Sequence, residues 1–423
     1  MGYDEHSIWI LEICSCGALV MSLEIDQFPY HEAVLKYFHQ HEKVRWEAFH
    51  DPAVSSDRES RMQLQLRKSA RRLQLVDALP WLYDVVNSAK LGSPVACYLA
   101  ATEPQLQVAA VPLLDQPRLV FTGSVLETLT QEEVLALVAG ELARLQFWQQ
   151  EGGEYLSARQ LLGELVEEKE VPRSHELTFH RFQLCTDLLV DQYALRSCGK
   201  AETVVSALIK CRSLPASIDK SLDAASLLEQ AQSLWETADP QTMSPSQRGL
   251  LLRIAALQES VKKPDLKITE LESKVTASQS VDELDLLQQF QLTDLTRQLI
   301  CYLLEPAWIQ TMAIMSYARS YFPDLLEEEL VTGSDLQIEQ LATVVQQYPE
   351  ALQDYFCFML LDFASADRDL KEAPLALALR WTDRLEMTER FREIAQRELR
   401  LRKMQFAEII RERDQILAAV EIG

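Results

Sequence analysis

The chain has 423 residues, and its 64 Asp and Glu residues outnumber its 41 Lys and Arg residues, which gives a formal net charge of −23. Hydrophobic residues make up 48% of the sequence, and with only 12 Gly and 16 Pro this composition excludes a collagen-like, low-complexity or largely disordered protein. Nucleic acid is not an expected partner, because phosphate backbones carry the same charge as the chain.

Targeting signals are the next class that the sequence bears on. No apolar run reaches the roughly 20 residues that a membrane-spanning helix requires. Residues 1–25 are fairly apolar but begin with Asp4 and Glu5, whereas a signal peptide begins with basic residues, so we interpret them as a peripheral segment. An alternative is that the native protein begins at Met21. The eight cysteines are scattered, which is typical of reduced thiols and predicts a cytoplasmic protein.

The order of apolar residues predicts the fold class. Apolar residues recur at helical spacing over residues 30–90. Three short apolar runs follow, at 95–101, 106–112 and 118–122, and the turn residues between them predict strands of one small sheet. Helical periodicity then continues almost to the end of the chain. We therefore expect a mainly α protein with one small β-sheet, followed by an all-α C-terminal domain.

One stretch, residues 263–282, is polar and has the weakest core signal. We interpret it as a linker between a domain at 26–262 and a helical domain at 283–423.

A helix start is predicted where Thr130 is followed by Glu133, because the two side chains can cap each other's backbone amides. The helix that follows is apolar around most of its circumference, which is typical of a buried helix. It contains one charged pair, Glu141 and Arg144. Residues three apart lie on the same side of a helix, so one interpretation is a local ion pair, and the other is that Glu141 is a functional carboxylate.

The strand at 119–122, the turn after it and this helix together resemble the HtpX and CAAX prenyl protease type of zinc metallopeptidase, whose corresponding helix carries HExxH. The resemblance implies a zincin-like α+β domain. Here the motif positions read Gly140, Glu141, Leu142, Ala143 and Arg144. Zinc needs two imidazoles on one face of the helix, but Gly140 has no donor atom and Arg144 carries a permanent positive charge. Glu141 keeps the position of the general base.

Residues 181–195 are similar to the family helix that supplies the third zinc ligand, a Glu, and a supporting Asp. Gln183 stands at the ligand position, and Asp187 keeps the supporting position. The resemblance therefore implies that all three ligands are lost, and no zinc or other cofactor is expected.

Such a domain can still bind a peptide by main-chain hydrogen bonds to the edge of its sheet, which need no metal. The candidate edge residues are Gln105, Gln107, Val108 and Ala109.

The C-terminal half resembles, over residues 337–398, a TerB-type helical domain. Its turn contains Asp367, Asp369 and Glu372, whose oxygens would suit a divalent cation. An alternative is that these three residues are a helix cap and the acidic residues of the first helical turn. Residues 388–420 alternate charges around apolar positions and predict one long amphipathic helix that packs within the chain or against a partner helix.

We expect, from the resemblance, a catalytically inactive peptidase-like protein that serves as a protein-binding or regulatory scaffold. The alternative is an active metal-dependent peptidase with a rebuilt metal site and Glu141 as general base. A third interpretation is a purely structural subunit of a larger assembly. The sequence names neither the partner nor the oligomeric state.

Overall fold

The computed structural model describes residues 28–423, except for residues 90, 102, 104, 112, 114–115, 169, 212–223, 238–244, 264–265, 277, 279, 327, 329, 331–334, 400–402 and 422–423. The peripheral segment expected at 1–25 lies outside the described residues. The chain divides into an N-terminal unit, residues 1–277, and a C-terminal unit, residues 278–423. The division falls within 263–282, the range expected as a linker, but a helix, α14 (Ile268–Thr276), occupies part of that range.

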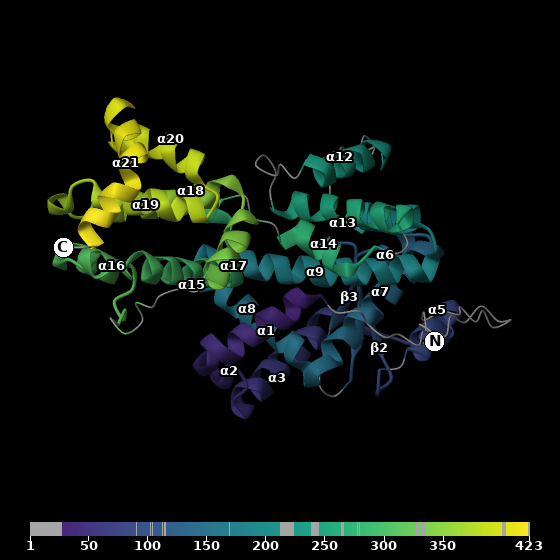
Figure 1. The fold of residues 1–423 in the computed structure, drawn as a ribbon. Coiled ribbons are helices and arrows are strands. Elements are labelled where there is room, and N and C mark those ends of the chain that lie inside the picture. Colours follow the sequence, from purple (N-terminus) through teal and green to yellow (C-terminus); the bar gives the residue numbers. More distant parts are fainter. Residues whose placement is uncertain are drawn as a thin grey trace, which may run out of the picture. The chain divides into compact units, whose positions relative to one another are not determined.

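The N-terminal unit contains a small sheet and a larger set of helices (Figure 1). The strands are β1 (Arg71–Leu73), β2 (Ala96–Ala100), β3 (Gln107–Val111) and β4 (Arg118–Thr122). Besides α14, the α-helices are α1 (Pro29–His41), α2 (Lys43–Phe49), α3 (Pro52–Ser69), α4 (Leu75–Ala78), α5 (Pro80–Ser88), α6 (Val125–Thr128), α7 (Gln131–Gln149), α8 (Glu154–Val166), α9 (Arg173–Cys198), α10 (Ala201–Cys211), α12 (Ala224–Thr237) and α13 (Pro245–Lys262). A 3₁₀ turn, η1 (Gln150–Gly153), joins α7 to α8.

The sheet has the strand order β1-β2-β4-β3. Strands β2 and β4 are parallel, whereas β1 and β3 pair antiparallel with β2 and β4. The three predicted strands are confirmed, and so is the mainly α fold class with one small sheet. The prediction of helix throughout residues 30–90 is wrong at β1, because a three-residue strand pairs with β2 and is too short to show an alternating pattern.

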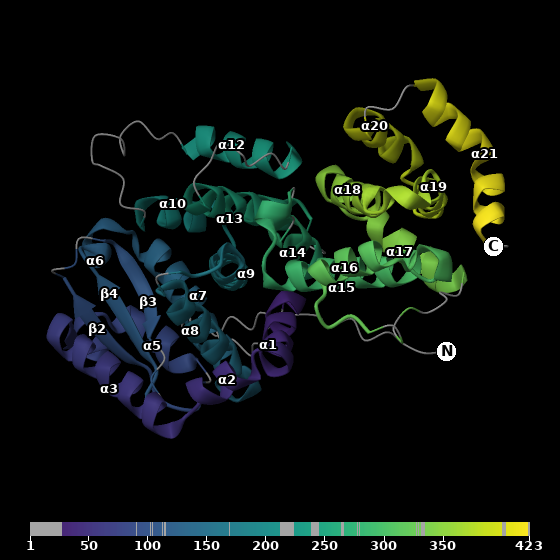
Figure 2. The same cartoon turned by 90° about the vertical axis from the view of Figure 1, so that its left-hand side faces the viewer.

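The two faces of the sheet pack against different helices. Ala100 and Val120 form a small cluster with Leu66 of α3. Leu119 and Phe121 alternate with Val120 along β4 and are fully buried on the opposite face. In Figure 2 the sheet lies between α3 on one side and α7 with α8 on the other.

The predicted cap of α7 is confirmed. The Glu133 amide donates to Thr130 Oγ1 (3.3 Å), and the Thr130 amide donates to the Glu133 carboxylate (2.8 Å). Glu133 also accepts hydrogen bonds from Ser206 and Lys210 of α10, at 2.6 and 2.8 Å. The cap therefore joins the beginning of α7 to α10. The motif residues 140–144 lie in the middle of this helix.

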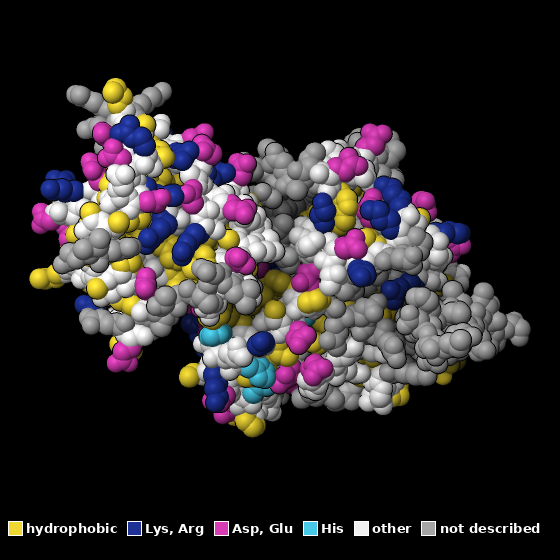
Figure 3. Space-filling view, in the orientation of Figure 1, with side chains coloured by type: hydrophobic (Ala, Val, Ile, Leu, Met, Phe, Trp, Pro, Cys, Tyr) yellow, Lys and Arg dark blue, Asp and Glu magenta, His cyan; other side chains and the backbone are white. Residues whose placement is uncertain are grey.

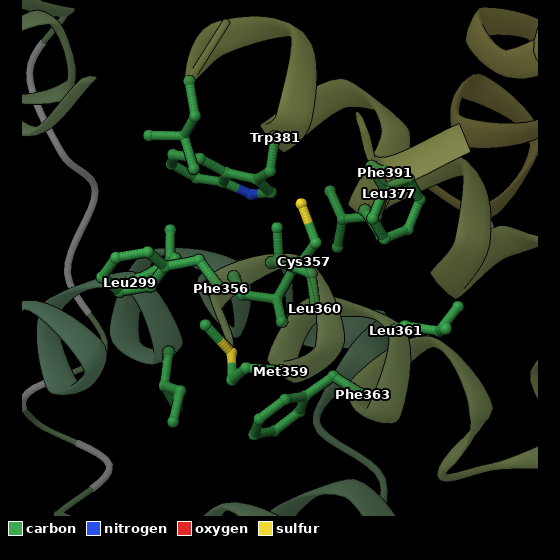
Figure 4. Packing of buried hydrophobic residues seen from close by; sticks show 14 of the residues in the cluster. Leu299, Phe356, Cys357, Met359, Leu360, Leu361, Phe363, Leu377, Trp381 and Phe391 are labelled. Atoms are coloured by element: carbon green, nitrogen blue, oxygen red, sulfur yellow. The ribbon is translucent and has the colours of Figure 1, made fainter. Parts of the chain in front are cut away.

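The regular secondary structure in the described part of the C-terminal unit is all helical. Its helices are α15 (Leu286–Leu303), α16 (Met312–Tyr321), α17 (Asp335–Gln346), α18 (Glu350–Ser365), α19 (Ala373–Arg384), α20 (Thr388–Leu399) and α21 (Lys403–Glu421), with 3₁₀ turns η2 (Val281–Glu283), η3 (Ala307–Ile309) and η5 (Arg368–Leu370). Figure 4 shows the core of this unit, in which Phe356 and Leu360 of α18 lie among Leu299 of α15, Leu377 of α19 and Phe391 of α20.

The single long helix expected at 388–420 is wrong. The structure has two helices there, α20 and α21, on either side of residues 400–402, and they run in different directions in Figure 2. Both contact α19, because their apolar residues Phe391 and Phe406 are fully buried in the core of the unit.

Among the described helices, none combines the length and the apolar character that crossing a membrane requires.

A buried histidine joins α1 to the central helices of the N-terminal unit. The His31 side chain is fully buried, with its ring centroid 4.7 Å from that of Phe147 on α7 and 4.5 Å from that of Phe182 on α9. Its Nε2 atom lies 3.0 Å from Thr186 Oγ1. Burial lowers the pKa of His31 to about 3, because the charged ring would lose its hydration there.

This pKa predicts acid sensitivity. An unfolded His31 has a pKa of about 6.5, so the unfolded chain binds one more proton than the folded chain as the pH falls from about 6.5 towards 3. Stability contributed by neutral His31 is present above pH 6.5 and decreases below it, by up to ~1.4 kcal/mol per pH unit. In His31→Gln this part of the slope should disappear from denaturant unfolding measured between pH 4 and 6.5. The matched control is His41→Gln, at an exposed position on the same helix, and an unchanged slope in His31→Gln would contradict the prediction.

Candidate functional site

The motif residues Glu141 and Arg144 of α7 meet Asp187 of α9. Arg144 Nε donates to both carboxylate oxygens of Glu141, at 3.0 and 3.2 Å. Arg144 Nη2 donates to Asp187 Oδ1 at 2.8 Å. The local pair of Glu141 with Arg144 is therefore confirmed, and the same guanidinium also joins α7 to α9.

Two residues that the sequence did not single out complete the cluster. Arg253 of α13 makes a two-point ion pair with Asp191, from Nε at 2.7 Å and from Nη2 at 2.8 Å, and its Nη1 lies 3.4 Å from Asp187 Oδ2. Asp187 and Asp191 are four residues apart on α9, so their carboxylates lie on one side of the helix. That spacing was the available signal for Asp191, whereas the pairing of Arg253 depends on how α13 packs against α9.

We call Glu141, Arg144, Asp187, Asp191 and Arg253 the ion cluster. The side chains of Glu141 and Arg144 are 12% and 14% exposed, and that of Asp191 is 2% exposed. Burial would raise the pKa of Asp187, but Arg253 and Arg144 outweigh it and hold that pKa below its usual value. At Asp191 burial prevails over Arg253 and raises the pKa. The two carboxylates also raise the pKa of Arg253, although burial opposes this effect.

Glu141 also reaches the sheet. Its Oε2 atom accepts a hydrogen bond from the Ala110 amide of β3 at 2.9 Å. Strand β3 is at the edge of the sheet, and in an antiparallel ladder alternate residues direct their N–H and C=O groups away from the neighbouring strand. Ala110 and Val108 thus share the outer edge of β3, and Glu141 takes one of its amides. Of the other predicted edge residues, Gln107 and Ala109 lie in β3 and Gln105 precedes it.

Gly140 lies against α9. A Cβ atom at Gly140 would be 2.8 Å from Val190 Cγ1 and 3.0 Å from the Val190 carbonyl oxygen. The glycine therefore marks a close approach of α7 to α9 in the middle of the helix. A side chain at position 140 would require α7 and α9 to move apart. Gln183 lies one turn before Asp187 on α9 and makes none of the hydrogen bonds of the ion cluster.

The residues present do not fit a zinc ion of the kind that HExxH binds. Gly140 offers no donor and no room for one, and Arg144 fills the space between the carboxylates with a positive charge. Within the described part of the chain no group of three His, Cys, Asp or Glu residues is arranged to hold a metal.

The acidic turn of the C-terminal unit has a structural use. Asp367 Oδ1 accepts a hydrogen bond from the Asp369 amide at 2.9 Å and thereby caps the turn η5. Asp369 and Glu372 are exposed. The interpretation of this turn as a helix cap is therefore correct for Asp367, but the helix that Asp367 caps is η5 and not α19.

The contact at Gly140 generates a test of the packing between α7 and α9. Gly140→Ala should destabilise the N-terminal unit by about 1–2 kcal/mol, because the strain of an added methyl group exceeds the ~1 kcal/mol that alanine gains in a helix. Gly249 is the matched control, because it also lies inside a helix but a Cβ atom there would meet nothing within 4 Å. Gly249→Ala should stabilise by up to ~1 kcal/mol. Equal effects of the two substitutions in denaturant unfolding would disprove the close packing.

The ion cluster generates a second test. Arg253→Met should destabilise the fold by roughly 3 kcal/mol, because it leaves Asp191 buried without its cation. Adding Asp191→Asn should recover much of this loss, since the uncompensated charge is then gone. Arg61→Met is the control, because both partners of the pair Arg61–Asp57 are 73% exposed, and it should change stability by less than ~0.5 kcal/mol. Thermal or denaturant unfolding of these three variants and of the unsubstituted chain decides between the outcomes.

Comparison with known proteins gives no family for this chain. No family model matches it, and neither a curated protein nor a solved structure matches it. The resemblance to zinc metallopeptidases therefore stays a prediction from the sequence.

Proposed function

We propose that this chain is a metal-free, peptidase-like protein that binds a partner polypeptide without cleaving it and acts as a regulatory scaffold. The observation that carries the proposal is the position of Arg144. Its guanidinium pairs with the carboxylates of Glu141 and Asp187, the residues at the general-base and supporting positions of the motif. A fixed positive charge thus stands at a position where the resemblance requires a metal ligand.

The state of Glu141 weighs against the alternative of a rebuilt active site. A general base needs a lone pair directed at a water or substrate proton. Both oxygens of Glu141 accept from Arg144, one of them also accepts from the Ala110 amide, and the side chain is 12% exposed. The carboxylate is therefore engaged on two sides by groups of the protein itself.

The binding part of the proposal rests on β3. An edge strand can add a further strand from a partner through main-chain hydrogen bonds. In this chain Val108 would supply the outward N–H and C=O groups, because Glu141 already holds the amide of Ala110. A docked strand therefore either pairs around Val108 alone or displaces Glu141.

The surface charges and the cysteines support a protein partner and a reducing compartment. On the face drawn in Figure 3, Lys and Arg side chains lie among Asp and Glu side chains, which favours a protein partner over a phosphate backbone. No disulfide joins the described cysteines, which are residues 97, 185, 198, 211, 301 and 357, as expected of a reducing compartment such as the cytoplasm.

Metal content separates the proposal from its rival. Full-length protein purified without chelator and supplied with zinc should contain far less than one zinc per chain by elemental mass spectrometry. It should not cleave peptides, and Glu141→Gln should leave this unchanged. About one zinc per chain, together with cleavage that Glu141→Gln abolishes, would establish the rebuilt peptidase instead.

A strand substitution tests the binding part. Val108→Pro removes an outward amide, and proline is tolerated on edge strands, so thermal melting should confirm folding. Partner proteins that co-precipitate with tagged full-length chain should be lost in Val108→Pro. They should be retained in Val44→Asp, which alters an apolar residue that is 81% exposed on α2. Retention of every partner in both variants would favour the purely structural subunit.

A further inference from the structure

Trp148, at the end of α7, has two arginines near its indole ring. The guanidinium carbon of Arg144 is 5.7 Å from the centroid of the indole ring, and that of Arg159 on α8 is 5.6 Å away. These distances are within the range in which a cation is attracted to an aromatic face. Trp148 is 5% exposed, so the three side chains form a compact, largely buried group beside the ion cluster.

The two arginines differ in their partners. Arg144 has Glu141 and Asp187, whereas Arg159 forms no ion pair within 4 Å with any residue that the structure describes. The indole Nε1 of Trp148 is also buried without a hydrogen-bond partner in the described part of the chain. Burial and the neighbouring Arg144 lower the pKa of Arg159, and the charges of Asp187 and Glu141 oppose this effect only in part. Among the residues that the structure describes, neither of these two neighbouring donors has an acceptor.

We propose that Arg159, with the Trp148 indole beside it, is a receptor for a carboxylate carried by an acidic side chain of the partner polypeptide. The inference rests on the proposed function, because contacts connect the edge strand to this receptor: Ala110 to Glu141, Glu141 to Arg144, Arg144 to Trp148, and Trp148 to Arg159. A strand docked on β3 would therefore lie beside the α7 face that leads to Arg159.

The neighbouring charges select the ligand. A guanidinium binds carboxylates and phosphates equally well in geometry. Asp187 and Glu141 are near enough to interact electrostatically with Arg159. They would repel a dianionic phosphate about twice as strongly as a singly charged carboxylate. The chain as a whole also carries a charge of −23, which adds to that difference.

A small carboxylate tests the receptor independently of strand docking. Full-length protein labelled with 5-fluorotryptophan is titrated with sodium acetate against sodium chloride at equal ionic strength, and the Trp148 resonance is followed by fluorine NMR. We expect a saturable shift with acetate that is lost in Arg159→Gln. Trp381 is an internal control, since Arg384 lies 5.4 Å from its ring centroid at an exposed position, and its resonance should not shift saturably.

Two peptides test the link to the partner. Acetyl-Thr-Val-Glu-Val-Thr-amide and its Gln counterpart differ by one charge, and their affinities are measured by fluorescence anisotropy of labelled forms. The Glu peptide should bind about 10-fold more tightly, the effect of one charge-assisted hydrogen bond. Arg159→Gln should remove this preference and leave the affinity for the Gln peptide unchanged.

The outcomes are distinguishable. An acetate shift that is absent, or that persists in Arg159→Gln, overturns the receptor, and so does a preference for Glu that survives Arg159→Gln. An Arg159-dependent acetate shift with no binding of either peptide upholds the carboxylate receptor and contradicts strand docking, and with it the binding part of the proposed function.

Discussion

The ion pairing of Arg144 is the interaction on which the rest of the candidate site depends. The Arg144 guanidinium pairs with Glu141 on its own helix, α7, and with Asp187 on α9. Asp187 in turn contacts Arg253 of α13. Each of these charges is partly or wholly removed from water, so each is tolerable only because the others are present. A metal ion would meet the same requirement for positive charge between carboxylates, and here a covalently attached cation meets it permanently.

This arrangement also fixes the position of the Glu141 carboxylate. Glu141 is held by Arg144 on one side and by the Ala110 amide on the other, so the helix and the sheet edge share one carboxylate. Gly140, one residue earlier, lets α7 approach the backbone of α9 at Val190. The close approach and the ion pairs support each other, because the short distance between the helices brings Arg144 within reach of Asp187.

Local signals in the sequence predicted much of the fold. The three strands of alternating or buried pattern, the cap formed by Thr130 and Glu133, and the pair of Glu141 with Arg144 all involve residues close together in the chain, and the structure has each of them. Strand β1 was missed because three residues carry no period. The pairing of Arg253 with Asp191 spans 62 residues and depends on how α13 packs on α9, which no local pattern encodes. The bond from Ala110 to Glu141 depends in the same way on tertiary packing.

The packing at Gly140 makes the effects of substitutions depend on their order. Because a Cβ atom at position 140 would meet both the side chain and the carbonyl of Val190, a residue such as histidine can enter there only after position 190 has become smaller and α9 has shifted. Positions 140 and 190 are therefore coupled, and the effects of substitutions at the two positions on stability should not add.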